Sequence, residues 1–267
     1  MYSTHQASFG QDFAMPKVDA LCTDEADAGA DHRPISVTDL RVAEIPDHWP
    51  APDQPRNMNK IISDDGEGYS TRRGSEFEFH WQYKDKYVGT VECQLGFDIN
   101  ANFDAVQRWY GRLDHKHGRY GRNVVEEPFK DVIRFVARQL KQRADDLGVR
   151  YGELALAFVQ SLPYQADMGG YQRYASECLL DRQGDCSDTS VLYAALMDVR
   201  DIAVIFLEFP THLMVGVRRE TDINDLIDEA TYYEHRSHRY YTAETTGWGW
   251  KVGQCDDCQR AVIYDCW

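Results

Sequence analysis

The sequence contains no apolar run that approaches the roughly 20 residues needed to span a bilayer. Residues 1–20 also lack the apolar core of a secretory signal. Basic side chains are scarce, because 29 Lys and Arg stand against 44 Asp and Glu, for a formal net charge of −15. Such a charge opposes binding to a nucleic-acid backbone or an anionic membrane. We therefore expect a cytoplasmic protein whose main partners are neither nucleic acid nor membrane.

The sequence also lacks the pattern of a disulfide framework. Its seven cysteines are an odd number spread over 267 residues, so at least one thiol is free unless it pairs with another molecule. Cys255 and Cys258 form a single C-x2-C pair, and Cys266 follows. A structural zinc site needs four ligands, and no fourth is evident here. We therefore expect no metal and no cofactor, and interpret these cysteines as a local disulfide or plain thiols, with zinc as the alternative.

Apolar residues are plentiful, at 43% of the chain, which is enough for a sizeable core. They are unevenly distributed, because residues 1–75 are acidic and hold most of the prolines. We interpret residues 1–75 as a largely irregular N-terminal extension, with a possible edge strand at 35–45. Residues 76–267 are predicted to form the folded domain.

Local patterns then predict the elements of this domain. Alternating apolar and polar residues over 76–98 predict two strands. The acidic segment 220–234 is interpreted as an exposed excursion. Helices with one antiparallel sheet after them are typical of the α+β class. Helices are expected at about 102–113, 127–147, 151–162 and 186–198, and further strands at 202–209, 212–217, 239–243 and 259–264.

A thiol, an imidazole and a carboxylate occur in an order that suits nucleophilic acyl transfer. Asp185 is a good N-cap, which places Cys186 in the first turn of a helix. The helix N-terminus can stabilise a thiolate, and its free N–H groups can hold an oxyanion. His212, at the start of a strand, can remove the thiol proton. Glu244, at the end of a later strand, can orient the imidazole.

Four blocks of sequence surround these three residues. They are FVQSLPY at 158–164, YQRYASECLL with GDCSDTSVL over 171–192, FPTHLMVGV at 209–217 and YYTAETTGWGWKVG at 240–253. In this order, the blocks resemble the transglutaminase-like superfamily of papain-like-fold cysteine enzymes, in its prokaryotic branch. The resemblance covers roughly residues 125–253 and is specific for the superfamily but not for a substrate.

The resemblance implies a papain-like core in which helices pack against an antiparallel sheet. It also implies that Cys186 is the nucleophile, His212 the general base and acid, and Glu244 the orienting carboxylate. The sequence departs from the family pattern at Ala175, where proline is usual, and at Cys178, where threonine is usual. Glu244 itself replaces the aspartate common in animal members.

The implied activity is thiol-dependent acyl transfer or hydrolysis on a peptide or carboxamide, through a thioester on Cys186. A peptide or protein substrate is the expected partner, and the sequence does not predict an oligomeric state. Two alternatives remain. One is a cysteine peptidase or amidase without transferase activity, and the other is a non-catalytic scaffold that binds a partner in the cleft.

Other residues near these blocks are weaker candidates. Gln160 is a candidate side-chain donor to the oxyanion, by analogy with the glutamine of papain-like enzymes, but it could equally bond a loop carbonyl. Tyr164, Trp248 and Trp250 are candidate walls of a substrate cleft, with ordinary packing as the alternative. Asp188 is expected to face away from the thiol, because a negative charge there would oppose the thiolate.

Overall fold

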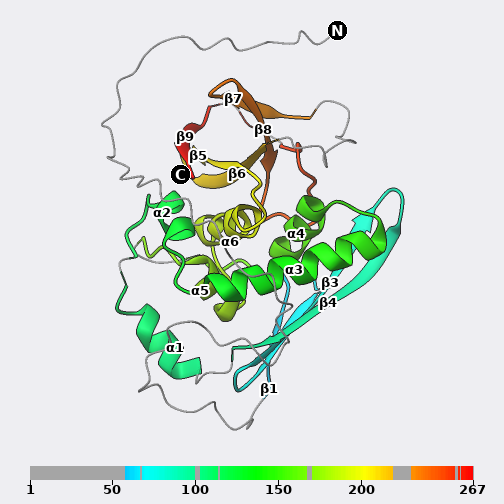
Figure 1. Ribbon diagram of the computed structural model, residues 1–267, viewed down its shortest axis with the longest axis vertical. Coiled ribbons are helices and arrows are strands. Elements are labelled where there is room, and N and C mark those ends of the chain that lie inside the picture. Colours follow the sequence, from blue (N-terminus) through cyan, green and yellow to red (C-terminus); the bar gives the residue numbers. More distant parts are fainter. Residues whose placement is uncertain are drawn as a thin grey trace, which may run out of the picture. The chain divides into compact units, whose positions relative to one another are not determined.

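The computed structural model describes residues 58–66, 68–99, 103–113, 115–166, 170–218, 230–255, 258 and 260–266. Most of the predicted N-terminal extension, including the possible strand at 35–45, lies outside the described residues, as does most of the acidic segment 220–234. The described part combines helices with two antiparallel sheets (Figure 1). The α+β class is therefore confirmed, although two sheets are present where the sequence predicted one.

The first sheet is a four-stranded antiparallel meander. It contains β1 (Met58–Ile62), β2 (Tyr69–Arg73), β3 (Glu76–Asp85) and β4 (Gly89–Asp98), in that spatial order. The alternation in β3 buries its aromatic residues on one face, and α4 packs against that strand. β2 pairs in register with β3, from Tyr69 opposite His80 to Arg73 opposite Glu76. Residues 58–62 and 69–73 thus belong to the sheet and not to an irregular extension.

Six helices lie in the described residues, and two of them were not predicted. These are the short α2 (Tyr120–Val125) and α5 (Ala175–Asp181). The other four helices match predicted helices within about three residues. They are α1 (Phe103–Tyr110), α3 (Lys130–Leu147), α4 (Tyr151–Gln160) and α6 (Cys186–Asp198). The longest of them, α3, is followed by Gly148, whose φ of 67° provides the left-handed C-cap that the sequence predicts.

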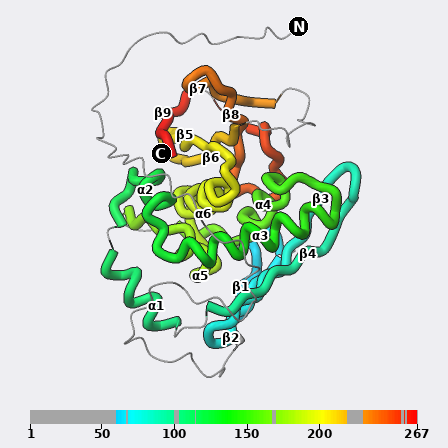
Figure 2. Tube along the Cα trace, viewed as in Figure 1, coloured from blue at the N-terminus to red at the C-terminus, as the bar shows by residue number. Residues whose placement is uncertain are grey.

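The second sheet has the order β7-β8-β6-β5-β9, and all of its pairs are antiparallel. α6 packs directly against β5 and β6, and also contacts α2, α3, α4 and α5 (Figure 2). Nearly every residue of α6 is buried, so it is the central helix of the core. The bounds of the strands are β5 (Val204–Phe209), β6 (His212–Arg218), β7 (Tyr232–His235), β8 (His238–Ala243) and β9 (Val262–Asp265).

None of the described helices is both long enough and apolar enough to cross a bilayer.

The packing of α6 positions the predicted catalytic residues. The first part of α6 lies next to the start of β6, because the hydroxyl of Ser190 donates to the carbonyl of Leu213 at 3.2 Å.

Candidate active site

Cys186 is the first residue of α6, as the sequence predicts. Asp185 caps the helix, and its Oδ1 accepts from the N–H groups of Ser187 at 2.8 Å and Asp188 at 3.0 Å. A Cβ on Gly184 would lie 2.7 Å from the Cβ of Asp188, so the chain needs glycine there. The Cys186 side chain is partly exposed, whereas the other free cysteines of the described residues are buried. The cap therefore presents one thiol at the start of an otherwise buried helix.

His212 and Glu244 meet beside this thiol. His212 Nε2 lies 2.7 Å from Glu244 Oε2. The other carboxylate oxygen accepts from the backbone N–H of Thr246 at 2.8 Å and from its hydroxyl at 2.6 Å. Cys186 is also close enough to the imidazole to contribute to the raised pKa of His212. Because Nε2 is bound to Glu244, Nδ1 is the ring nitrogen left for an interaction with the sulfur. The structure therefore brings the three predicted residues together in the order thiol, imidazole, carboxylate.

The electrostatics of the group favour a charged imidazole. Burial lowers the pKa of His212, but its interactions with Cys186 and Glu244 outweigh burial and raise the pKa to about 10. Burial raises the pKa of Glu244, but the hydrogen bond and charge of His212 outweigh it and lower the pKa overall. At neutral pH the imidazole of His212 is therefore protonated, and it lies between the carboxylate of Glu244 and the sulfur atom of Cys186.

A cluster of buried hydroxyl groups ties the three segments together, and the sequence reasoning missed it. The hydroxyl of Thr245 lies 3.0 Å from that of Thr189 and 3.2 Å from that of Ser190. Ser190 also donates to the carbonyl of Leu213 at 3.2 Å. Each of these residues is within four positions of the thiol, imidazole or carboxylate. Polar residues beside candidate catalytic groups, in segments that are otherwise apolar, were the signal that could have revealed this cluster.

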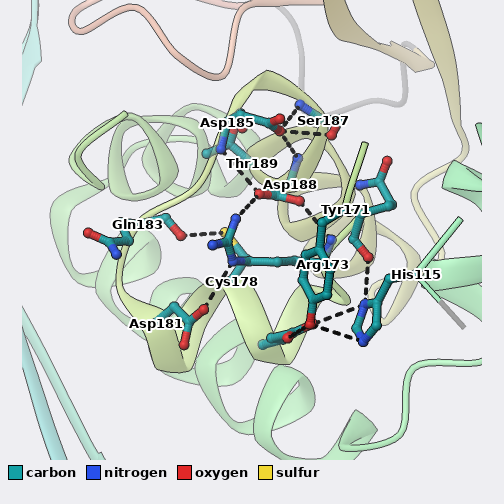
Figure 3. Close-up of polar contacts among 12 residues, drawn as sticks. His115, Tyr171, Arg173, Cys178, Asp181, Gln183, Asp185, Ser187, Asp188 and Thr189 are labelled. Atoms are coloured by element: carbon teal, nitrogen blue, oxygen red, sulfur yellow. Dashed lines mark hydrogen bonds and ion pairs between the residues drawn. The ribbon is translucent and has the colours of Figure 1, made fainter. Parts of the chain in front are cut away.

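Asp188 faces away from the thiol, as predicted, and enters a second polar network. Figure 3 shows the guanidinium of Arg173 between Asp181 and Asp188, with contacts of 3.0 and 2.6 Å. Asp188 also accepts from the backbone N–H of Arg173 at 2.8 Å and of Asp185 at 3.2 Å. Burial, and then the charge of Asp185, raise the pKa of Asp188 to about 6 against the opposing effect of Arg173. This network fixes the loop that carries the cap of α6.

Gln160 does not serve as a free donor to an oxyanion. Its Nε2 donates to the backbone carbonyls of Glu244 at 2.7 Å and Trp250 at 3.1 Å. A primary amide has two N–H donors, and both are used here. The expectation of an oxyanion donor is therefore wrong for this state of the side chain. The alternative, a bond to loop carbonyls, describes what Gln160 does, and it fixes the segment that carries Glu244.

The three candidate cleft residues are all near these groups. Tyr164 is 50% exposed and forms a bridge with Gly184, two residues before the thiol. A Cβ on Gly247 would lie 2.5 Å from the indole of Trp250 and 3.4 Å from Glu244, so this indole stands against the carboxylate segment. The ring of Trp248 is covered by Lys84, whose Nζ is 3.9 Å from its centroid. Tyr164 and Trp250 therefore border the site more directly than Trp248.

The C-terminal cysteines do not form a metal site in the described part of the chain. Cys255 and Cys258 form a disulfide next to Met214. Cys266 is buried in the main core, and its carbonyl lies close to Gly121 of α2. Among the described residues, no three His, Cys, Asp or Glu side chains could hold a metal ion. Cys255 and Cys258 therefore form the local disulfide that the sequence favours, and Cys266 is a free thiol.

Comparison with known proteins adds no relative. The chain matches no family model, no curated protein and no solved structure.

Proposed function

We propose that this protein is a transglutaminase-like cysteine enzyme with a papain-like core, acting on a peptide or carboxamide through a thioester on Cys186. One observation carries the proposal. The Cys186 thiol, at the N-terminus of a buried helix, lies within interaction range of the imidazole of His212, whose Nε2 is 2.7 Å from a carboxylate oxygen of Glu244. A binding surface has no need for this chain of three groups. Nucleophilic catalysis needs all three, to activate the sulfur and to move a proton.

Each group has a role in the first half of the proposed reaction. The thiolate of Cys186 attacks the carbonyl carbon, and the carbonyl oxygen becomes an oxyanion. His212 gives its Nδ1 proton to the departing nitrogen, so that the C–N bond breaks and ammonia or an amine leaves. Glu244 stabilises the imidazolium before this transfer and orients the ring throughout. The product is a thioester on Cys186.

The second half regenerates the thiolate. Water or a primary amine loses a proton to Nδ1 of His212 and attacks the thioester, and the C–S bond breaks. The outcome is hydrolysis with water and acyl transfer with an amine. In both halves the oxyanion needs a donor. The N–H groups of Ser187 and Asp188 are already donated to Asp185, which leaves the N–H of Cys186 as the first-turn donor for this role.

Selective alkylation tests whether the thiol is activated. We expect iodoacetamide at pH 7 to label Cys186 well before the buried thiols, and to do so much more slowly in His212→Ala. The matched control is His235→Ala, because His235 also pairs with a carboxylate, Asp265, at 2.7 Å. Labelling of Cys186 no faster than that of a small model thiol would contradict the activated thiol.

Ammonia release then separates the possible outcomes. Carboxamide peptides are incubated with and without a primary amine, and both ammonia and the peptide products are measured. Incorporation of the amine indicates transfer, and a free acid indicates hydrolysis. An activated Cys186 that releases no ammonia or amine from any peptide would point to the non-catalytic scaffold instead.

A further inference from the structure

Glu208 is a carboxylate at the end of β5 that no cation neutralises among the described residues. Its two oxygens accept from the hydroxyls of Tyr120 on α2, at 2.7 Å, and Tyr264 on β9, at 2.6 Å. Two other carboxylates of this domain illustrate pairing with cations. Asp188 binds Arg173, and Asp265 binds Arg236 and His235. Glu208 differs from these because its side-chain partners in the described part of the chain are two neutral phenols.

This carboxylate lies beside the candidate active site. Glu208 is paired with Leu213, and the next pair along the two strands contains His212. The backbones of Glu208 and His212 are therefore neighbours, although consecutive pairs direct their side chains to opposite faces of the sheet. Tyr120 reaches Glu208 from α2. Burial raises the pKa of Tyr120 most, followed by its hydrogen bond to Glu208, and the charge of Cys186 contributes to the same rise. Tyr120 therefore links Glu208 to α2, which packs against α6, the helix that begins at Cys186.

The two phenols leave part of the hydrogen-bonding capacity of Glu208 unused. The hydrogen bond to Glu208, followed by burial, raises the pKa of Tyr264 to about 12, so the phenol donates and stays neutral. A carboxylate offers roughly four acceptor positions, and the phenols use one on each oxygen. Glu208 is partly exposed, and so is Tyr264. A group from solution can therefore approach this carboxylate while the phenols hold it in place.

We propose that Glu208 recognises a positive charge on the acyl substrate, an ammonium or guanidinium close to the carbonyl that Cys186 attacks. The proposal rests on the function proposed above and adds the substrate class: a basic peptide. A cation would satisfy the remaining acceptor positions and balance a charge that the described residues leave without a cation. The phenols orient the carboxylate, so the cation meets a fixed partner.

Charged thiol reagents test the local field without any knowledge of the substrate. Methyl methanethiosulfonate is neutral, and its 2-aminoethyl analogue carries an ammonium. Labelling rates are measured at Cys186 by mass spectrometry and expressed as the ratio of cationic to neutral reagent, relative to a small thiol. We expect a ratio roughly fivefold above that of the small thiol, which falls towards one in Glu208→Gln. Glu234→Gln on β7, an exposed carboxylate that pairs with Arg239, is the control and should keep the full ratio.

Paired peptides test recognition during turnover and distinguish the source of the charge. One pair has lysine or its neutral isostere norleucine next to the scissile residue, and another has a free or an acetylated α-amino group. Hydrolysis is measured without added amine, so that only the acyl substrate is tested. We expect kcat/KM to be roughly tenfold higher for the cationic member of one pair, and this preference to disappear in Glu208→Gln.

The outcomes separate this inference from the proposed function. A preference for the cation that survives Glu208→Gln, or no preference in an active enzyme, would overturn the inference and leave the function standing. No turnover of any peptide would overturn the function, while the reagent ratio would still report on Glu208. Tyr264→Phe keeps the carboxylate and loses one of the two phenols that orient it, so it should weaken the preference without abolishing it, and an unchanged preference would contradict the inference. It gives a second reading if Glu208→Gln folds poorly.

Discussion

Two acid–base pairs flank the start of α6, and they differ in ways that match different tasks. His212 lies 2.7 Å from Glu244, and Arg173 lies 2.6 Å from Asp188. The His212 side chain is 30% exposed, whereas that of Arg173 is 10% exposed and that of Asp188 is completely buried. An arginine keeps its charge at every physiological pH, but a histidine can gain and lose a proton. The buried pair therefore suits a fixed structural role, and the open pair suits proton transfer.

The buried pair, Arg173–Asp188, also affects the electrostatics around the open pair, His212–Glu244. Asp188 is two residues from Cys186, where an unbalanced negative charge would disfavour the thiolate. Arg173 pairs with both Asp188 and Asp181, so the negative charge of Asp188 has a cationic partner. The His212–Glu244 pair can then act on the sulfur without this opposing charge. Substitutions that break one pair or the other should therefore change different quantities.

Loss of the buried cation should have the largest effect. Arg173→Met leaves Asp188 and Asp181 without their shared partner, and breaking a buried ion pair costs about 3–5 kcal/mol of unfolding free energy. Urea unfolding at pH 7 measures this. The control is Arg239→Met, whose exposed pair with Glu234 at 3.5 Å should contribute less than about 1 kcal/mol. Equal losses of unfolding free energy in the two variants would contradict the larger contribution of the buried pair.

Glu244→Gln should reduce activity more than stability. The amide can still hydrogen-bond to His212, but it has no charge to stabilise the imidazolium. We expect kcat to fall about a hundredfold, equivalent to about 2.7 kcal/mol, while the unfolding free energy changes by less. Asp265→Asn likewise replaces a carboxylate with an amide, in the His235 pair, and should leave kcat unchanged. A large loss of stability with normal kcat would make the open pair structural as well.

Gln160→Met should have an intermediate effect on stability. It removes the two hydrogen bonds to the carbonyls of Glu244 and Trp250, which together contribute about 2 kcal/mol. We expect a loss of that size in urea unfolding, with a decrease in kcat of less than tenfold. The opposite result, a hundredfold lower kcat at unchanged stability, would return Gln160 to the role of oxyanion donor. Gln82→Met removes an exposed bond to Glu92 and serves as the control.

The smallest effect is a pH-dependent stability difference between the wild type and His212→Gln. The pKa of His212 is raised from 6.5 to about 10, so its contribution is complete below pH 6.5, declines above it and is lost beyond about pH 10. The pKa of Glu244 is lowered from 4.5, so its contribution declines as the pH falls below 4.5. The difference should therefore peak near pH 4.5–6.5, at about 1 kcal/mol after solvent screening. A constant difference from pH 4 to 11 would contradict an ionic pair.

Local chemistry made part of this structure predictable. The N-cap Asp185 and the glycine before it place Cys186 at a helix start from nearest neighbours alone. The alternating aromatics of β3 and the C-cap Gly148 follow equally local rules. These features depend on residues within about four positions of each other, and that is the range over which backbone preferences and capping act.

Features that depend on distant partners were not predictable in the same way. Both buried residues of β2, Ser70 and Thr71, are polar, so the strand has no apolar signal. Glutamine at the end of α4 has several possible partners, and only the fold shows that it binds a loop 84 residues away. The environment of Glu208 has the same origin, since its phenols come from α2 and β9.

The bond between Gln160 and the Glu244 segment also has a consequence for the order of folding. Contacts between distant parts of a chain form late, because the intervening loop must first close. Cys186 can acquire its helix cap from neighbouring residues, but its imidazole and carboxylate come from later strands. During synthesis, the nucleophile therefore leaves the ribosome before its base and its orienting acid. We expect the nascent chain to carry an ordinary thiol, which becomes reactive only after the second sheet has formed.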